Sequence, residues 1–181
     1  MRKRTGLFLT LVLVGALALT ALASYGTAAL GKNGDLKGRK LSGYLEVPSI
    51  STAGRGTIEA KINNNSTIDY KLTYSGLTGG AASAAHIHFG QPGVAGGVAA
   101  FLCGGGGKPV CPATSGTVSG TIVGSDVIGP AAQGIGAGEI GELIAAMKAG
   151  FTYANVHTPT YPNGEIRGQI RARGNGDGDD D

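Results

Sequence analysis

The sequence predicts an all-β protein, a Greek-key antiparallel β-sandwich with one short helix near residues 138–149. Two observations predict this fold class. Most segments alternate apolar and polar residues between Gly, Pro or Asn, which is the pattern of half-buried antiparallel strands. A single segment carries the helical period instead. Many short strands with little helix, in one domain of about 140 residues, indicate a β-sandwich.

The expected strands follow one another between turn residues. The NNNS run at 63–66 is expected to form a hairpin turn, because asparagine adopts left-handed backbone at low cost. The prolines and the Asn-Gly pair of TPTYPN are expected to close another hairpin near the C-terminus. The expected strands are 41–47, 56–62, 67–77, 84–90, 116–123, 151–157 and 164–172.

The segment GEIGELIAAMKAG, at 138–150, is expected to be an amphipathic helix. Its apolar residues recur at positions i, i+3, i+4 and i+7, so one stripe of the helix would pack into the core. These residues are Ile140, Leu143, Ile144 and Met147.

The two ends of the chain are expected to lie outside the domain. MRKR, an apolar run and a small-residue cleavage pattern are typical of a secretory signal peptide, here 1–23, although an uncleaved anchor is the alternative. Residues 24–39 are expected to be an N-terminal linker and 40–173 the β-sandwich domain. Residues 174–181, with four aspartates, are expected to be a disordered acidic tail. The protein is therefore expected to be secreted, or periplasmic in the cell envelope.

Charge and cysteine content narrow the partners. The 15 Lys and Arg outnumber the 12 Asp and Glu by three, and residues 2–4 of the expected signal are all basic, so the mature chain is near neutral. No nucleic-acid partner is expected. Cys103 and Cys111 flank a glycine-rich loop in a chain expected to be exported, which predicts a disulfide. Their spacing matches no common Cys-x-x-Cys metal motif, which disfavours two thiolate ligands.

A candidate metal site begins with AAHIHFG at 84–90. Residues two apart on a strand project from one face about 7 Å apart, so His86 and His88 point the same way and can chelate one ion. The third histidine, His157, ends a strand on which Tyr153 and Asn155 share its face. If the two strands meet, three imidazoles converge. The alternative is that the histidines are ordinary strand residues.

The donor type narrows the ion. Three imidazoles without a thiolate suit copper, or alternatively zinc, and not calcium or magnesium, which prefer oxygen. An acceptor must fix the tautomer of each ring, and Tyr153, Asn155 or a backbone carbonyl are the candidates. Glu165 and Arg167 share one face of the last strand. They either form a surface ion pair, or Arg167 lends positive charge to an anion that approaches the site.

Four segments together resemble the CHRD domain, the module named from chordin. They are LSGYLEVPSISTAGRGTIEAKI, AAHIHFG, FTYANVHT and YPNGEIRGQI, and the resemblance spans about residues 40 to 172. The FLCGGGG segment resembles bacterial exported single-domain members. In chordin, such domains belong to an extracellular antagonist, so the resemblance implies an extracellular module. The domain is also similar, more loosely, to copper–zinc superoxide dismutase. That similarity implies copper ligands at His86, His88 and His157 and an anion-guiding, catalytic role for Arg167.

Functions of different classes fit these observations. The leading hypothesis is an exported copper-binding protein for copper handling or superoxide-type redox chemistry, so the sequence does not decide whether it is an enzyme. The alternative is a non-enzymatic extracellular protein-interaction module with an unknown protein partner. A zinc hydratase or hydrolase is the third hypothesis. A membrane contact is expected only through an uncleaved signal.

Overall fold

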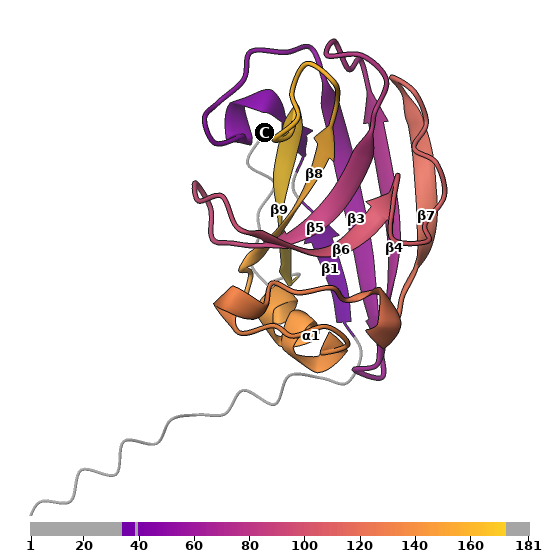
Figure 1. The fold of residues 1–181 in the computed structure, drawn as a ribbon, viewed down its shortest axis with the longest axis vertical. Helices are drawn as coiled ribbons and strands as arrows, with labels where there is room; N and C mark the ends of the chain where they lie inside the picture. The colour runs from indigo at the N-terminus through magenta and orange to yellow at the C-terminus, as the bar shows by residue number, and fades with distance from the viewer. Residues whose placement is uncertain (1–33, 39, 173–181) are drawn as a thin grey trace, which may run out of the picture.

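The computed structural model describes residues 34–38 and 40–172 (Figure 1). The predicted signal peptide at 1–23 and the acidic tail at 174–181 lie outside the described residues. The strands are β1 Gly34–Gly38, β2 Leu41–Ser42, β3 Arg55–Asn63, β4 Thr67–Ser75, β5 Ala84–Phe89, β6 Gly97–Cys103, β7 Gly116–Ile122, β8 Thr152–His157 and β9 Ile166–Ala172. The helices are η1 Gly43–Leu45, η2 Gly124–Asp126, η3 Ala131–Gln133 and α1 Ile140–Lys148.

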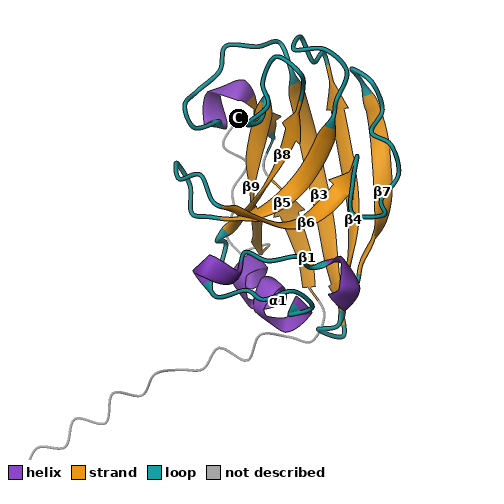
Figure 2. Cartoon of the chain, in the orientation of Figure 1, coloured by secondary structure: helices purple, strands orange, loops and turns teal. Residues whose placement is uncertain are grey.

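The strands form one antiparallel sheet in the order β6-β5-β8-β9-β1-β3-β4-β7, with the short β2 paired to β3 and β9. The sheet curves until its edge strands β6 and β7 approach each other (Figure 2). The hydroxyl of Tyr70 on β4 donates to the carbonyl oxygen of Leu102 on β6 at 2.7 Å, which joins the two halves across the interior. One half of the curved sheet is β6-β5-β8-β9 and the other is β1-β3-β4-β7. The connections β4–β5, β6–β7 and β7–β8 each run from one half to the other. The predicted all-β Greek-key sandwich is confirmed.

Local sequence explains the turn and the helix. Asn64 and Asn65, the first two of the three residues between the paired Asn63 and Thr67, have φ of 48° and 53°, left-handed values that asparagine adopts at low cost. The predicted turn at 63–66 is therefore confirmed. The predicted helix is also confirmed, because Leu143, Ile144 and Met147 of α1 are buried in the core. Each such apolar side chain stabilises the fold by about 1.5–3 kcal/mol.

Three parts of the chain differ from the expected strands. Strand β1 lies inside the 24–39 range expected to be a linker and pairs with β3 and β9. The 41–47 segment gives only the short β2 before the chain turns into η1. Strand β6 was not expected, because GVAAFLC is almost uniformly apolar and does not alternate. In the described part of the chain, no helix has the length and apolar character needed to cross a membrane.

The two halves of the sheet differ in how they are covered. In β3 and β4, buried and exposed residues alternate, so one face meets the core and the other meets water. In β8, by contrast, all six residues are buried, including Asn155 and His157. Ala154 and Val156 belong to the core cluster, so the polar face of β8 is covered by other parts of the chain. This covered polar face carries the candidate site.

Candidate metal centre

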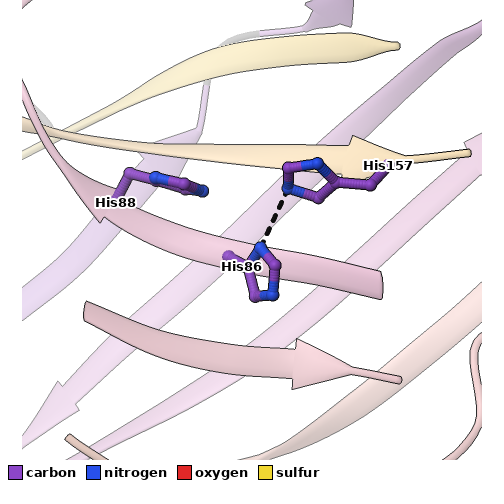
Figure 3. Close-up of side chains that lie close together, drawn as sticks. All are labelled: His86, His88 and His157. Atoms are coloured by element: carbon purple, nitrogen blue, oxygen red, sulfur yellow. Dashed lines mark hydrogen bonds between the residues drawn. The ribbon is translucent and has the colours of Figure 1, made fainter. Parts of the chain in front are cut away.

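The pairing of β5 with β8 brings the three histidines together. In this antiparallel register Ala84 lies opposite His157, and His86 lies opposite Asn155. His157 is therefore a diagonal neighbour of His86 on the same face of the sheet. Figure 3 shows the three rings directed toward one another from the two strands. The expectation that these strands meet is confirmed.

The nitrogens of the three rings lie almost as close together as the ligands of one metal ion. One potential ligand nitrogen from each ring lies within 4.8 Å of the others. His86 Nδ1 and His157 Nε2 are 2.9 Å apart, and the ring centroids of His88 and His157 are 6.0 Å apart. Imidazole ligands of one ion lie about 4 Å apart or less, because each metal–nitrogen bond is about 2.0 Å long. The ligand nitrogens therefore need to move together only slightly, from within 4.8 Å to within about 4 Å, to bind one ion.

Two backbone carbonyls fix the tautomers of two rings. His88 Nδ1–H donates to the carbonyl oxygen of Gly96 at 2.9 Å, and His157 Nδ1–H donates to that of Pro162 at 3.0 Å. Because a carbonyl only accepts, each proton lies on Nδ1 and each lone pair on Nε2. His86 Nδ1–H then donates to His157 Nε2. Of the acceptors expected from the sequence, the structure uses backbone carbonyls for this task.

Unpaired nitrogens in a buried place indicate that the cluster suits a metal. His86 Nε2 and His88 Nε2 are buried without a hydrogen-bond partner. His86, His88 and His157 are 9%, 7% and 8% exposed. A buried nitrogen without a partner destabilises a protein by about 1–3 kcal/mol, and a metal ion would satisfy its lone pair. The three residues therefore fit an ion that accepts imidazole ligands.

Burial also keeps the rings in the form that binds metal. Desolvation, with repulsion from His157 and His88, lowers the pKa of His86 to about 3. Desolvation lowers the pKa of His88 to about 4, although the hydrogen bond to Gly96 opposes this shift. Desolvation likewise lowers the pKa of His157. Protons therefore compete weakly for these nitrogens at neutral pH.

Tyr153 lies between His88 and Arg167. Its ring stacks on the imidazole of His88, with centroids 4.8 Å apart and 9° between the planes. The guanidinium carbon of Arg167 lies 3.4 Å from the centroid of the same Tyr153 ring. Two flat groups cannot share one ring face at these distances, so His88 and Arg167 lie on opposite faces of Tyr153. We call this arrangement the His88–Tyr153–Arg167 stack.

Residues 90–96, which we call the covering loop, are bound to the stack and to the adjoining strand face. Arg167 Nη2 donates to the carbonyl oxygens of Gln91 and Val94 at 3.1 and 2.9 Å. The guanidinium thus acts inside the fold, and Arg167 is only 3% exposed. This placement favours a positioning role for Arg167 over the expected guidance of anions. Further anchors join the Gly96 N–H to Tyr153 Oη at 3.1 Å and Gln169 Nε2 to the Gly90 carbonyl at 2.9 Å.

Asn155 and Glu46 lie beside the stack. Asn155 Oδ1 and Glu46 Oε1 are buried without a hydrogen-bond partner. Desolvation raises the pKa of Glu46 to about 7, although the charge of Arg167 opposes this shift. A Cβ at Gly164 would overlap Glu46 Oε1 and Asn155 Nδ2, so only glycine leaves room for both groups. Asn155 is thus next to the site, as expected.

Of the two alternatives for Glu165 and Arg167, the surface ion pair is wrong, because both side chains are buried. Glu165 is 0% exposed, and its carboxylate serves as the common acceptor for loops at one end of the sheet. Burial alone would raise the pKa of Glu165, but hydrogen bonds outweigh burial and lower it. The donors are Thr52 Oγ1 at 2.6 Å, Thr78 N at 2.7 Å, Thr78 Oγ1 at 3.2 Å, Gly79 N at 3.0 Å and Thr158 Oγ1 at 3.0 Å.

The predicted disulfide between Cys103 and Cys111 is confirmed. It begins at the end of β6, two residues after Phe101. The ring of Phe101 contacts His86 edge-on, with centroids 4.4 Å apart and 82° between the planes. The strand that the disulfide anchors therefore supplies an apolar wall of the histidine cluster.

Sequence reasoning missed several groups that surround the site. The carbonyls of Gly96 and Pro162 carry no signal in their side chains. Glu46 lies in a segment expected to be a plain strand, and Phe101 lies in a strand that was not expected. One signal could have indicated the covering loop, because the glycine-rich GQPGVAGG directly follows the histidine strand.

Comparison with known protein families matches residues 38–170 to the CHRD domain. The matched range contains all three histidines, the covering loop and the disulfide. No curated protein and no solved structure gave a match.

Proposed function

The chain belongs to the CHRD domain family, and from this premise we propose that it is an exported module that holds one copper ion through His86, His88 and His157. An extracellular setting is supported by the family and by the disulfide, which fits an oxidising compartment. The observation that carries the proposal is the convergence of three buried, neutral imidazoles within 4.8 Å. Two of these rings have a nitrogen without a partner.

Each histidine has a defined task in this proposal. His88 and His157 would bind the ion through Nε2, because carbonyls hold their Nδ1 protons. His86 would release its hydrogen bond to His157 and turn a lone pair to the ion. Since the rings are already neutral, binding displaces few protons near neutral pH. Bound copper would supply one-electron redox chemistry, while the chain orients the rings and excludes water from them.

Copper is proposed over zinc because, among the divalent first-row metal ions, the copper ion binds nitrogen ligands most tightly. Copper handling is proposed over superoxide turnover, because Arg167 contacts the covering loop and the Tyr153 ring instead of solvent. A superoxide-decay assay on the copper-loaded protein tests this point. If superoxide decays no faster than in buffer without protein, the protein is a carrier. Catalytic decay of superoxide that requires all three histidines indicates an enzyme.

The experiment that tests the binding proposal loads the purified protein with Cu(II) and, separately, with Zn(II). We expect one tightly held equivalent of copper after desalting, and its loss in both His86→Ala and His157→Ala. A truncation after Arg173 is the matched control, because it removes the aspartate-rich tail and keeps the histidines. Undiminished copper in either histidine variant would exclude the three-histidine site. Copper lost only on truncation would assign the metal to the tail, and a protein without metal affinity would favour the interaction module.

A further inference from the structure

The net charge of the site depends on the oxidation state of the ion. The group of potential ligands found among the described residues consists of three imidazoles, with no carboxylate or thiolate. Neutral ligands leave the full charge of the ion uncompensated in a place where the rings are at most 9% exposed. The desolvation energy of an ion rises with the square of its charge, so a divalent ion pays about four times the penalty of a monovalent one.

The nearest fixed charge adds to this difference. Arg167 is always protonated, is 3% exposed, and lies one aromatic ring away from His88 in the stack. Its repulsion doubles when the ion carries a second charge. The carboxyl group that faces Arg167 is Glu46, and burial raises its pKa to about 7, so Glu46 offsets little of this charge in mildly acidic solution. Glu165 is enclosed by its own donors, including Thr52 and Thr158.

Ligand number favours the same oxidation state. Monovalent copper has a filled d shell and is stable with three nitrogen ligands, whereas divalent copper and zinc usually add a water or anion. Arg167 holds the covering loop through the Gln91 and Val94 carbonyls, and Gly96 of that loop binds His88. The histidines therefore lie in a closed environment, and the described residues add no further His, Cys, Asp or Glu to this ligand group.

We propose that this site selects monovalent over divalent copper, and that Arg167 is the residue that enforces the selection. Arg167 acts by repelling the second charge and by holding the covering loop closed. The inference rests on the proposed function, because it names the oxidation state held by the same three histidines. It also assigns Arg167 as a specificity-determining residue that does not touch the ion.

The test compares two affinities of the full-length protein at about pH 6, where Glu46 is largely protonated. Cu(I) affinity is measured without oxygen, with ascorbate, by competition with bicinchoninate. Cu(II) affinity is measured by competition with nitrilotriacetate and by spin resonance. We expect Cu(I) to bind at least about tenfold more tightly than Cu(II), and Arg167→Met to reduce this ratio about tenfold. Arg167→Lys keeps the charge and is expected to retain most of the ratio.

Controls separate selection from folding. Circular dichroism checks each variant, and Arg167→Gln, which keeps an N–H donor for the loop, replaces Arg167→Met if the latter does not fold. Glu46→Gln keeps this carboxyl position neutral and is expected to keep the wild-type ratio. Equal affinities of the wild type for Cu(I) and Cu(II) would overturn the selection while leaving copper binding intact. An unchanged ratio in the folded, uncharged Arg167 variant would overturn the role of Arg167. A wild type that binds neither ion would refute the proposed function itself.

Discussion

His86 Nδ1 lies 2.9 Å from His157 Nε2, so two candidate ligands on neighbouring strands are already within hydrogen-bond distance of each other. The β5–β8 register creates this contact, since it makes the two residues diagonal neighbours. The third ring, that of His88, is held by a hydrogen bond to the Gly96 carbonyl and by stacking on Tyr153, neither of which is a candidate ligand. The cluster is therefore organised by the fold, with His86 as the ring that must change its hydrogen bond to accept an ion.

His86 and His88 of the metal-free protein are expected to titrate far below the usual range of histidine. Burial lowers the pKa of His86 to about 3 and that of His88 to about 4. Because the unfolded chain then binds more protons than the folded one, the free energy of unfolding should fall as pH drops from about 6.5 toward 4. The ring Cε1–H signals in proton NMR measure the midpoints. A midpoint near 6.5 for either ring would contradict the burial described.

Glu165→Gln is expected to destabilise the protein by about 3 kcal/mol, because the amide replaces a carboxylate that accepts several buried hydrogen bonds. Urea unfolding measures the change. Glu142→Gln, on an exposed position of α1, is the matched control and should change stability by less than about 0.5 kcal/mol. The folded pKa of Glu165 is lowered, so its stabilisation exists above the unfolded pKa and is lost as pH falls through the folded one. Equal effects of both substitutions would refute this assignment.

Glu46 is expected to affect the pH dependence of stability in the direction opposite to Glu165, and Glu46→Gln removes this effect. The folded pKa of Glu46 is about 7 against an ordinary value of 4.5, so the folded state holds this proton more tightly. Stability from this group is present below the lower value and is lost as pH rises through about 7. Between about pH 5 and 8 the wild type should lose up to about 3 kcal/mol relative to the variant. Urea unfolding of both proteins at pH 5 and pH 8 measures this change. If the wild type and Glu46→Gln differ in free energy of unfolding by the same amount at both pH values, Glu46 is solvated.

Replacing both Cys103 and Cys111 by serine is expected to lower the free energy of unfolding by about 2.5 kcal/mol, the chain-entropy value for a separation of eight residues. Copper binding should survive, because β6 remains paired with β5 and keeps Phe101 against His86. Thermal unfolding and copper stoichiometry are measured on the same sample. A folded double variant without copper would mean that the disulfide itself holds the site together.

Strand alternation and one helical period were enough to predict the fold class and α1, and the asparagine run at 63–66 was enough to predict the hairpin turn. Alternation also placed His86 and His88 on one face, with His157, Tyr153 and Asn155 on one face of the other strand. These are local properties, which the sequence displays directly. Strand β6 escaped prediction because a strand buried on both faces shows no alternation.

The surroundings of the histidines could not be predicted, because they depend on contacts between distant segments. Arg167 and Glu165 look like an exposed pair on a strand, yet loops cover that face and give each a separate set of partners. The tautomers depend on the carbonyls of Gly96 and Pro162, which any residue could supply. Position in the fold, and not residue type, determines these roles.

X-ray absorption at the copper edge is the sharpest test of the three-histidine copper centre, because it counts and identifies the ligands of the bound ion. For the protein loaded with one equivalent of copper, we expect three imidazole nitrogens at about 2.0 Å, with the ring scattering of histidine. His157→Ala should reduce the imidazole count or abolish binding. A first shell made only of oxygen atoms, or an imidazole count unaffected by His157→Ala, would contradict a copper centre built from His86, His88 and His157.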